Sequence, residues 1–197
     1  MENTTHGPDE KPILSFDDIK AWRKWLDKNH ASSSGVWLRL AKKGACTTSV
    51  TRNESLEAAL CYGWIDGMAK SEGDETWLQK VTPRTKRSIW SKRNCEIVER
   101  LTDSGEMRPA GLAEIARARA DGRWEAAYDG PKNMTVPEDL EKRLSRNKKA
   151  KAFFESLDSR NRFAILFRIY TAKKAETREK RIRKFVEMLI RQEKIYP

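Results

Sequence analysis

Residues 61–67 read CYGWIDG, and they lie where a helical pattern of apolar residues gives way to a strand pattern. Before them, residues 51–62 begin with the capping box TRNE and place Leu56, Ala59 and Leu60 on one helical face. After them, residues 64–69 and 76–81 have the composition of two strands, with a turn at residues 71–74. Helix followed by hairpin predicts an α+β fold, in which helices pack on a small antiparallel sheet.

The segments before residue 51 are predicted to add a strand and a helix to this α+β fold. Residues 36–42, VWLRLAK, alternate between two faces and predict a further strand. Residues 16–28 carry apolar side chains at helical spacing, after a capping-box-like start at Ser15. Residues 1–14 are polar, and we expect a flexible leader there. Downstream, further helices are predicted to begin after Ser91 and at Pro109.

The C-terminal part differs in both pattern and charge. After a linker at residues 130–136, helical spacing recurs from Pro137 and over residues 148–157, 160–171 and 177–193. Residues 141–197 hold 18 Lys/Arg and 7 Asp/Glu, whereas residues 1–140 hold 22 of each kind. The sequence therefore predicts two modules, an α+β domain at residues 15–130 and a basic helical module at residues 137–197.

Composition excludes several classes of protein. The 197 residues include seven Trp, enough apolar material for a real core, and no apolar run approaches the roughly 18 residues of a membrane span. The N-terminus lacks a signal-peptide pattern, and three scattered Cys and two His predict neither a disulfide framework nor a zinc site. Nucleotide-binding glycine motifs and the GxSxG motif are missing. We expect a cytoplasmic protein without metal or cofactor, and nothing in the sequence indicates its oligomeric state.

The junction at residues 61–67 is the first candidate for a site. Tyr62 and Trp64 could stack on a ligand, and Asp66 could accept a hydrogen bond or a proton. The alternative is a tight turn whose aromatic side chains fill the core while Asp66 caps backbone amides.

The second candidate is the stretch TPRTKRSIWSKRN at residues 82–94, which places five cations and four hydroxyls around Trp90. Guanidinium groups next to a helix N-terminus can hold phosphate, sulfate or carboxylate. The alternative is a solvated connector in which Arg87 pairs with an acid such as Asp66. Where the two stretches meet we predict a cleft for a small anionic or aromatic ligand. Its predicted lining is Tyr62, Trp64, Asp66, Arg84, Arg87, Ser88, Trp90 and Arg93.

Two other features allow both a functional and a structural interpretation. His30 could act as a general base, but a His after a helix more often interacts with the helix C-terminus. The basic C-terminal module could contact nucleic acid. Intrahelical pairs such as Glu176–Lys180 favour a solvated amphipathic helix instead, so nucleic acid is a candidate partner that we do not favour.

With these motifs in place, the sequence resembles the YdeI/OmpD-associated (OmdA) family of bacteriocin-protection proteins. The matching segments are residues 25–26, 29–30, 35–38, 57–67, 82–84, 88–94, 107–111, 121–124, 152–157, 161–165, 171–174, 177–178 and 181–182. The resemblance implies a role in survival against antimicrobial peptides or other stress. It brings no catalytic residue and no cofactor.

Three functions follow as expectations. The first is a stress or bacteriocin-protection protein that acts by binding a ligand in the predicted cleft. The second is a small-molecule enzyme in the same cleft, with Asp66 or His30 as the acid/base and Arg84 and Arg87 stabilising negative charge. The third is an accessory protein that binds nucleic acid.

Overall fold

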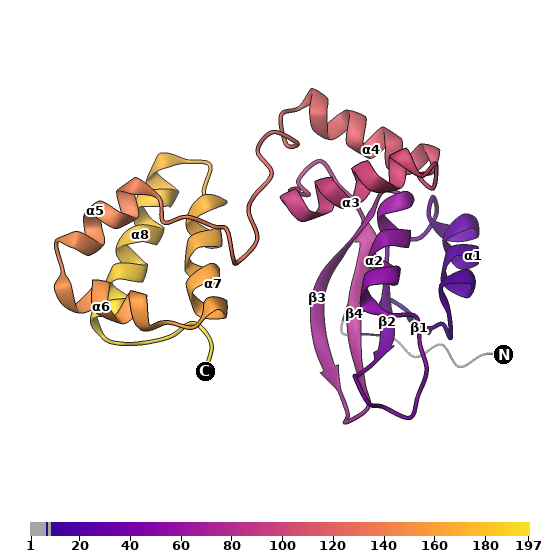
Figure 1. Ribbon diagram of the computed structural model, residues 1–197, viewed down its shortest axis with the longest axis horizontal. Coiled ribbons are helices and arrows are strands. Elements are labelled where there is room, and N and C mark those ends of the chain that lie inside the picture. The colour runs from indigo at the N-terminus through magenta and orange to yellow at the C-terminus, as the bar shows by residue number, and fades with distance from the viewer. Residues whose placement is uncertain (1–6, 8) are drawn as a thin grey trace. The chain divides into compact units, whose positions relative to one another are not determined.

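The computed structural model describes residue 7 and residues 9–197, which form two compact units. The first unit extends to Trp90 and resumes over Asn94–Ala127, and the second comprises Ser91–Arg93 and Tyr128–Pro197. Each unit has its own hydrophobic core. The protein is α+β in the first unit and helical in the second, as predicted (Figure 1).

The sheet of the first unit has four strands in the order β1-β2-β4-β3. They are β1 (Ile13–Ser15), β2 (Val36–Ala41), β3 (Trp64–Glu72) and β4 (Thr76–Pro83). β1 pairs with β2 in parallel, and the other pairs are antiparallel. The sheet is therefore mixed, not purely antiparallel as the sequence predicted. A strand of three residues is too short to show the alternation that reveals the other strands.

The predicted leader also joins the sheet sooner than expected. The Trp37 indole N–H donates to Asp9 Oδ1 at 2.7 Å, and Lys80 Nζ lies 2.5 Å from Asp9 Oδ2. These contacts fix the chain just before β1. Residues 1–6 and 8 of the predicted leader lie outside the described residues.

Four helices accompany the sheet of the first unit: α1 (Ile19–Asn29), α2 (Arg52–Cys61), α3 (Lys92–Asp103), which belongs to this unit from Asn94 on, and α4 (Pro109–Ala120). The predicted capping box of α2 is present, since Thr51 and Glu54 each accept a hydrogen bond from the other's backbone N–H. α1 begins later than predicted because Asp18, not Ser15, caps it by accepting from Ala21 N. α1 packs on α2, which lies against the sheet (Figure 1).

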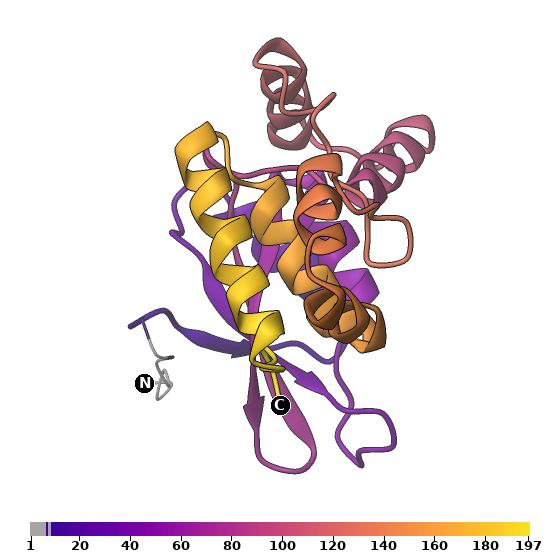
Figure 2. The ribbon, with the colours of Figure 1, turned by 90° about the vertical axis from the view of Figure 1, so that its left-hand side faces the viewer.

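The second unit contains α5 (Glu138–Ser145), α6 (Lys148–Ser156), α7 (Ser159–Tyr170) and α8 (Ala175–Ile190). α8 contacts each of the other three helices (Figure 2). Its apolar stripe of Ile182, Phe185 and Leu189 is buried in the core of this unit. None of the described helices is long and apolar enough to cross a bilayer.

Candidate functional site

The two stretches that were predicted to form a cleft lie side by side. Arg84 N donates to Gly63 O at 2.9 Å, and Trp64 is paired with Pro83 across the sheet. However, Trp64 and Trp90 are each only 1% exposed and belong to the core of the first unit. The structure thus places both indoles inside the fold and not on an open wall. Ligand binding through them stays a prediction, and it would require the core to open.

Tyr62 and His30 are also held by structural contacts. The Tyr62 hydroxyl donates to Asp27 Oδ1 at 2.6 Å. The pKa of Tyr62 is raised mainly by burial and, to a smaller extent, by this hydrogen bond. His30 Nδ1 lies 2.8 Å from Leu26 O at the end of α1, and His30 O accepts from the Trp64 indole at 3.1 Å. His30 therefore interacts with the helix C-terminus, which is the structural alternative considered above.

Asp66 has a different partner from the one considered above. It lies on β3, and its Oδ2 is 3.4 Å from Arg52 Nη2 at the start of α2, whereas no ion pair joins it to Arg87 among the described residues. Its side chain is 19% exposed, so it retains some access to solvent. An acid/base role for Asp66 or His30 stays a prediction. No group of three or more potential metal ligands occurs in residues 7 and 9–197.

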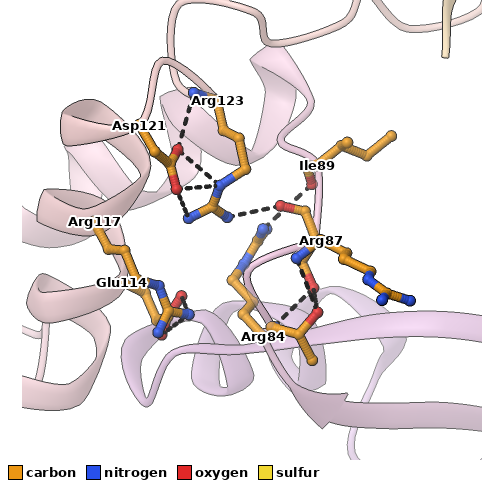
Figure 3. A network of polar contacts seen from close by, with 9 residues as sticks. Arg84, Arg87, Ile89, Glu114, Arg117, Asp121 and Arg123 are labelled. Atoms are coloured by element: carbon orange, nitrogen blue, oxygen red, sulfur yellow. Dashed lines mark hydrogen bonds and ion pairs between the residues drawn. The ribbon is translucent and has the colours of Figure 1, made fainter. Parts of the chain in front are cut away.

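Two buried arginines hold the loop between β4 and α3 from the inside (Figure 3). The Arg84 guanidinium lies 3.6 Å from the centroid of the Trp90 ring and donates to Ile89 O at 3.3 Å. Arg123 donates to Ser88 O at 2.8 Å and pairs with Asp121 at 2.8 Å. Arg84 thus packs inside this loop, and its predicted binding of a ligand stays a prediction.

Of the remaining predicted residues, Ser88 is half-buried, and Arg87 and Arg93 are exposed. Ser88 Oγ accepts from Thr85 N at 2.9 Å, and Arg87 N donates to Thr85 Oγ1 at 3.2 Å, so the turn is ordered by its own hydroxyls. The Arg87 side chain is exposed, and Figure 3 shows it pointing away from Arg84. Arg93, in the first turn of α3, is exposed as well.

A hollow with aromatic walls lies on α7 in the second unit, and we call it the α7 groove. Its volume is about 610 Å³. Its lining residues are Pro131, Ser159, Arg160, Phe163, Ala164, Phe167, Arg168 and Tyr196. The Phe163 and Phe167 rings lie one helical turn apart with centroids 5.5 Å from each other. Tyr128 packs edge-on against Phe167 at 4.8 Å, which fixes that wall.

Two guanidinium groups flank the phenol of Tyr196 in this groove. Arg160 lies 4.2 Å from the centroid of the Tyr196 ring, and Arg168 Nη2 donates to the Tyr196 hydroxyl at 3.4 Å. That hydrogen bond and the Arg168 charge lower the Tyr196 pKa. Within the described residues, neither arginine forms an ion pair with a carboxylate. The α7 groove therefore combines an apolar floor with positive charge that the described chain does not pair.

A buried amide positions Tyr196. Asn161 is 1% exposed, and its Oδ1 accepts from Ile195 N at 3.0 Å and Tyr196 N at 2.9 Å. Its Nδ2 donates to Tyr196 O at 3.2 Å. Sequence reasoning missed this site because it took residues 160–171 only as one more helix of the basic module and singled out no side chain there. The available signal was the spacing of Arg160, Phe163 and Phe167 along one face of α7.

The fold is that of a two-unit protein, with an α+β domain followed by a small helical domain that carries the α7 groove. The chain belongs to the family described as Domain of unknown function (DUF8412), whose model matches residues 14–114. Residues 133–192 match the OmdA model, described as Bacteriocin-protection, YdeI or OmpD-Associated. The predicted OmdA resemblance is thus confirmed in the second unit. No curated protein and no solved structure matches the chain.

Proposed function

We propose that this chain takes part in bacteriocin protection by binding a small anionic aromatic ligand in the α7 groove, and that it does so in the cytoplasm. The OmdA match at residues 133–192 supports the protective role. Arg160, Phe163, Phe167 and Arg168 lie inside the matched range. Most of the proposed ligand site therefore falls within the OmdA match, and Pro131 and Tyr196 lie just outside it.

The observation that carries the proposal is that aromatic walls lie beside two guanidinium groups that form no ion pair with a carboxylate of the described residues. Guanidinium groups form strong, charge-assisted hydrogen bonds with carboxylate and phosphate. Half-buried Phe163 and Phe167 offer ring faces and edges to a planar molecule. A pocket with apolar walls and a few fixed polar groups is the usual form of a small-molecule site. An aromatic carboxylate satisfies both features at once.

Arg168 is the better placed of the two cations. Its side chain is half-buried and is held at both ends, since Nη1 donates to Ala164 O at 2.9 Å and Nη2 to Tyr196. A cation held in this way loses little freedom when it binds an anion. Arg160 is more exposed and can adapt to the ligand.

Isothermal titration with indole-3-carboxylate tests the proposal, with neutral indole-3-carboxamide as the matched control ligand. We expect saturable binding of the carboxylate and much weaker binding of the amide. Arg168→Gln should weaken the carboxylate at least about tenfold, because a charge-assisted hydrogen bond contributes on the order of 1.5–3 kcal/mol. Equal affinity of wild type and Arg168→Gln for the carboxylate would contradict the proposal.

The cleft predicted from the sequence provides the matched control variant. Arg87→Gln removes an exposed cation of the first unit without touching the α7 groove. We expect its affinity for indole-3-carboxylate to equal that of wild type. A loss of binding in Arg87→Gln, with Arg168→Gln unaffected, would instead assign the ligand to the surface beside Trp90.

A further inference from the structure

A second hollow lies in the first unit between α3 and α4, and we call it the α3/α4 groove. Its volume is about 270 Å³. Its lining residues are Val98, Glu99, Thr102, Asp103, Leu112, Ile115, Ala116, Arg119 and Trp124. Val98 and Ile115 form a buried floor, whereas Leu112 is 43% exposed at the rim. An exposed leucine beside an apolar hollow leaves apolar surface in water, which costs free energy unless something covers it.

The two acidic side chains of the rim, Glu99 and Asp103, lie on α3 at positions where their negative charges destabilise the helix. Glu99 and Asp103 are four residues apart on α3, so their like charges repel each other. Asp103 is also the last residue of the helix, where the macrodipole disfavours an anion. Neither carboxylate forms an ion pair with any residue that the structure describes. Their placement costs stability, and a cation bound between them would recover it.

The one cation lining the α3/α4 groove does not fill that role. The Arg119 guanidinium lies 4.8 Å from the centroid of the Trp124 ring, and among the described residues it pairs with neither Glu99 nor Asp103. Trp124 in turn packs against Trp90 with ring centroids 5.1 Å apart. The aromatic wall of the groove therefore packs on a core residue, while the acidic rim lies on α3.

We infer that the α3/α4 groove docks a cationic amphipathic peptide helix. One or two apolar side chains of the peptide would enter between Leu112, Ile115 and Trp124, while its Lys or Arg side chains reach Glu99 and Asp103. The volume lies just below the range of about 300–1,000 Å³ that is typical of ligand pockets, which suits an anchor side chain and not a whole ligand. An apolar groove between two helices is a common docking site for an amphipathic helix.

The distribution of charge makes the test of this inference selective. The net charge of +11 comes from residues 141–197, so long-range electrostatics repel a cationic peptide from the second unit. Residues 1–140 hold 22 basic and 22 acidic residues, so binding of such a peptide to the first unit depends on a local acidic and apolar site. The inference is also independent of the α7 groove, which lies in the other unit and selects the opposite charge.

Fluorescence anisotropy with the full chain tests the inference. The probe is a labelled synthetic peptide of Leu and Lys at helical spacing, and the matched control peptide carries Glu in place of Lys. We expect the Lys peptide to bind saturably and the Glu peptide not to bind. The double variant Glu99→Gln/Asp103→Asn should weaken the Lys peptide about tenfold or more and reduce the salt dependence of its affinity. Leu112→Ala should weaken it as well.

Two control variants separate this site from the rest of the chain. Glu96→Gln removes an exposed carboxylate of α3 that does not line the groove, and Arg168→Gln changes only the α7 groove. Both should keep wild-type affinity for the Lys peptide, and circular dichroism should show all variants folded. Unchanged affinity in Glu99→Gln/Asp103→Asn, or equal binding of both peptides, would overturn the inference. So would a dimer of the chain that Leu112→Asp dissociates, because a second copy would then occupy the groove.

Discussion

In the first unit, two packed tryptophans lie between two arginines, in a row that leads from the core to the surface. Arg84 stacks on Trp90, Trp90 packs on Trp124, and Arg119 covers the far ring. A guanidinium is a flat and weakly hydrated cation, so it can be buried against an indole at less cost than an ammonium group. This stacking explains how Arg84 can be only 5% exposed.

Arg84→Ala should therefore unfold the first unit more easily. It removes the stacking on Trp90, the hydrogen bond to Ile89 O and the volume between them, so we expect a loss of about 2–4 kcal/mol in the free energy of unfolding. Urea denaturation followed by tryptophan fluorescence measures it. The control Arg87→Ala, at an exposed side chain, should change stability by less than about 0.5 kcal/mol. Similar losses of unfolding free energy in both variants would show that the stacking of Arg84 on Trp90 does not stabilise the first unit.

Tyr196 should titrate below its ordinary value of 10.0 because Arg168 donates a hydrogen bond to its hydroxyl. The folded state then releases this proton more readily than the unfolded chain. The lowered pKa of Tyr196 stabilises the folded chain fully at a pH above the pKa that Tyr196 has in the unfolded chain. This stabilisation is lost as the pH falls through the pKa of Tyr196 in the folded chain. The pKa of Tyr196 is measured by tyrosinate absorbance as a function of pH, as the difference between the wild-type chain and the Tyr196→Phe variant. Arg168→Gln should return it toward 10.0, and an unchanged pKa would mean that Arg168 does not control this phenol.

Helix packing in the first unit depends on one close approach. A Cβ built on Gly111 of α4 would lie 2.3 Å from Cys61 O at the end of α2. The backbone of Gly111 is helical, so its conformation does not require glycine. Glycine is required because a side chain would have no room beside Cys61 O. The contact brings α4 next to the junction between α2 and β3, which is the stretch CYGWIDG.

Gly111→Ala should force α2 and α4 apart. Alanine favours a helix over glycine by about 1 kcal/mol, but the clash with backbone outweighs this gain. We expect a net destabilisation of about 1–3 kcal/mol in urea denaturation. Gly130→Ala is the matched control, since nothing lies within 4 Å of its added Cβ and no left-handed backbone is involved. A Gly111→Ala variant as stable as Gly130→Ala would rule out the close approach.

Most elements could be predicted because their patterns are local. The capping box at Thr51, the alternation of β2 and the Pro109 start of α4 each depend on neighbouring residues only. β1 could not be predicted, since the strand it pairs with, β2, lies more than twenty residues further along the chain. The α7 groove was harder to predict from the sequence than β1. Tyr196 reaches the α7 groove through Asn161, a contact between residues 35 apart that no local pattern reveals.

The whole chain divides by charge as well as by structure. The excess of positive charge lies in residues 141–197, all of them within the second unit. Each unit has a separate core, so neither depends on the other to bury its apolar residues. Residues 131–133 of the second unit are exposed, whereas Met134 and Val136 just after them pack against its core, so this short stretch is the weak point of the chain.

Brief trypsin digestion should therefore cut first at Lys132, which is exposed in this segment. Both fragments should keep their helical circular dichroism, because each retains its core. Mass spectrometry identifies the first cut. Initial cleavage within α3 or α4, or loss of helix from the fragments, would contradict the division into two independently stable units.

Amide NMR spectra of the full chain, recorded during titration with indole-3-carboxylate, test ligand binding by the OmdA domain most directly. We predict saturable shifts at Arg160, Phe163, Phe167, Arg168 and Tyr196, with the amides around Trp64 and Trp90 unchanged. The Arg168→Gln variant should show much smaller shifts at the same ligand concentration. Shifts centred on residues 61–67 and 84–94, or no shifts at α7, would contradict the assignment of the ligand to the α7 groove.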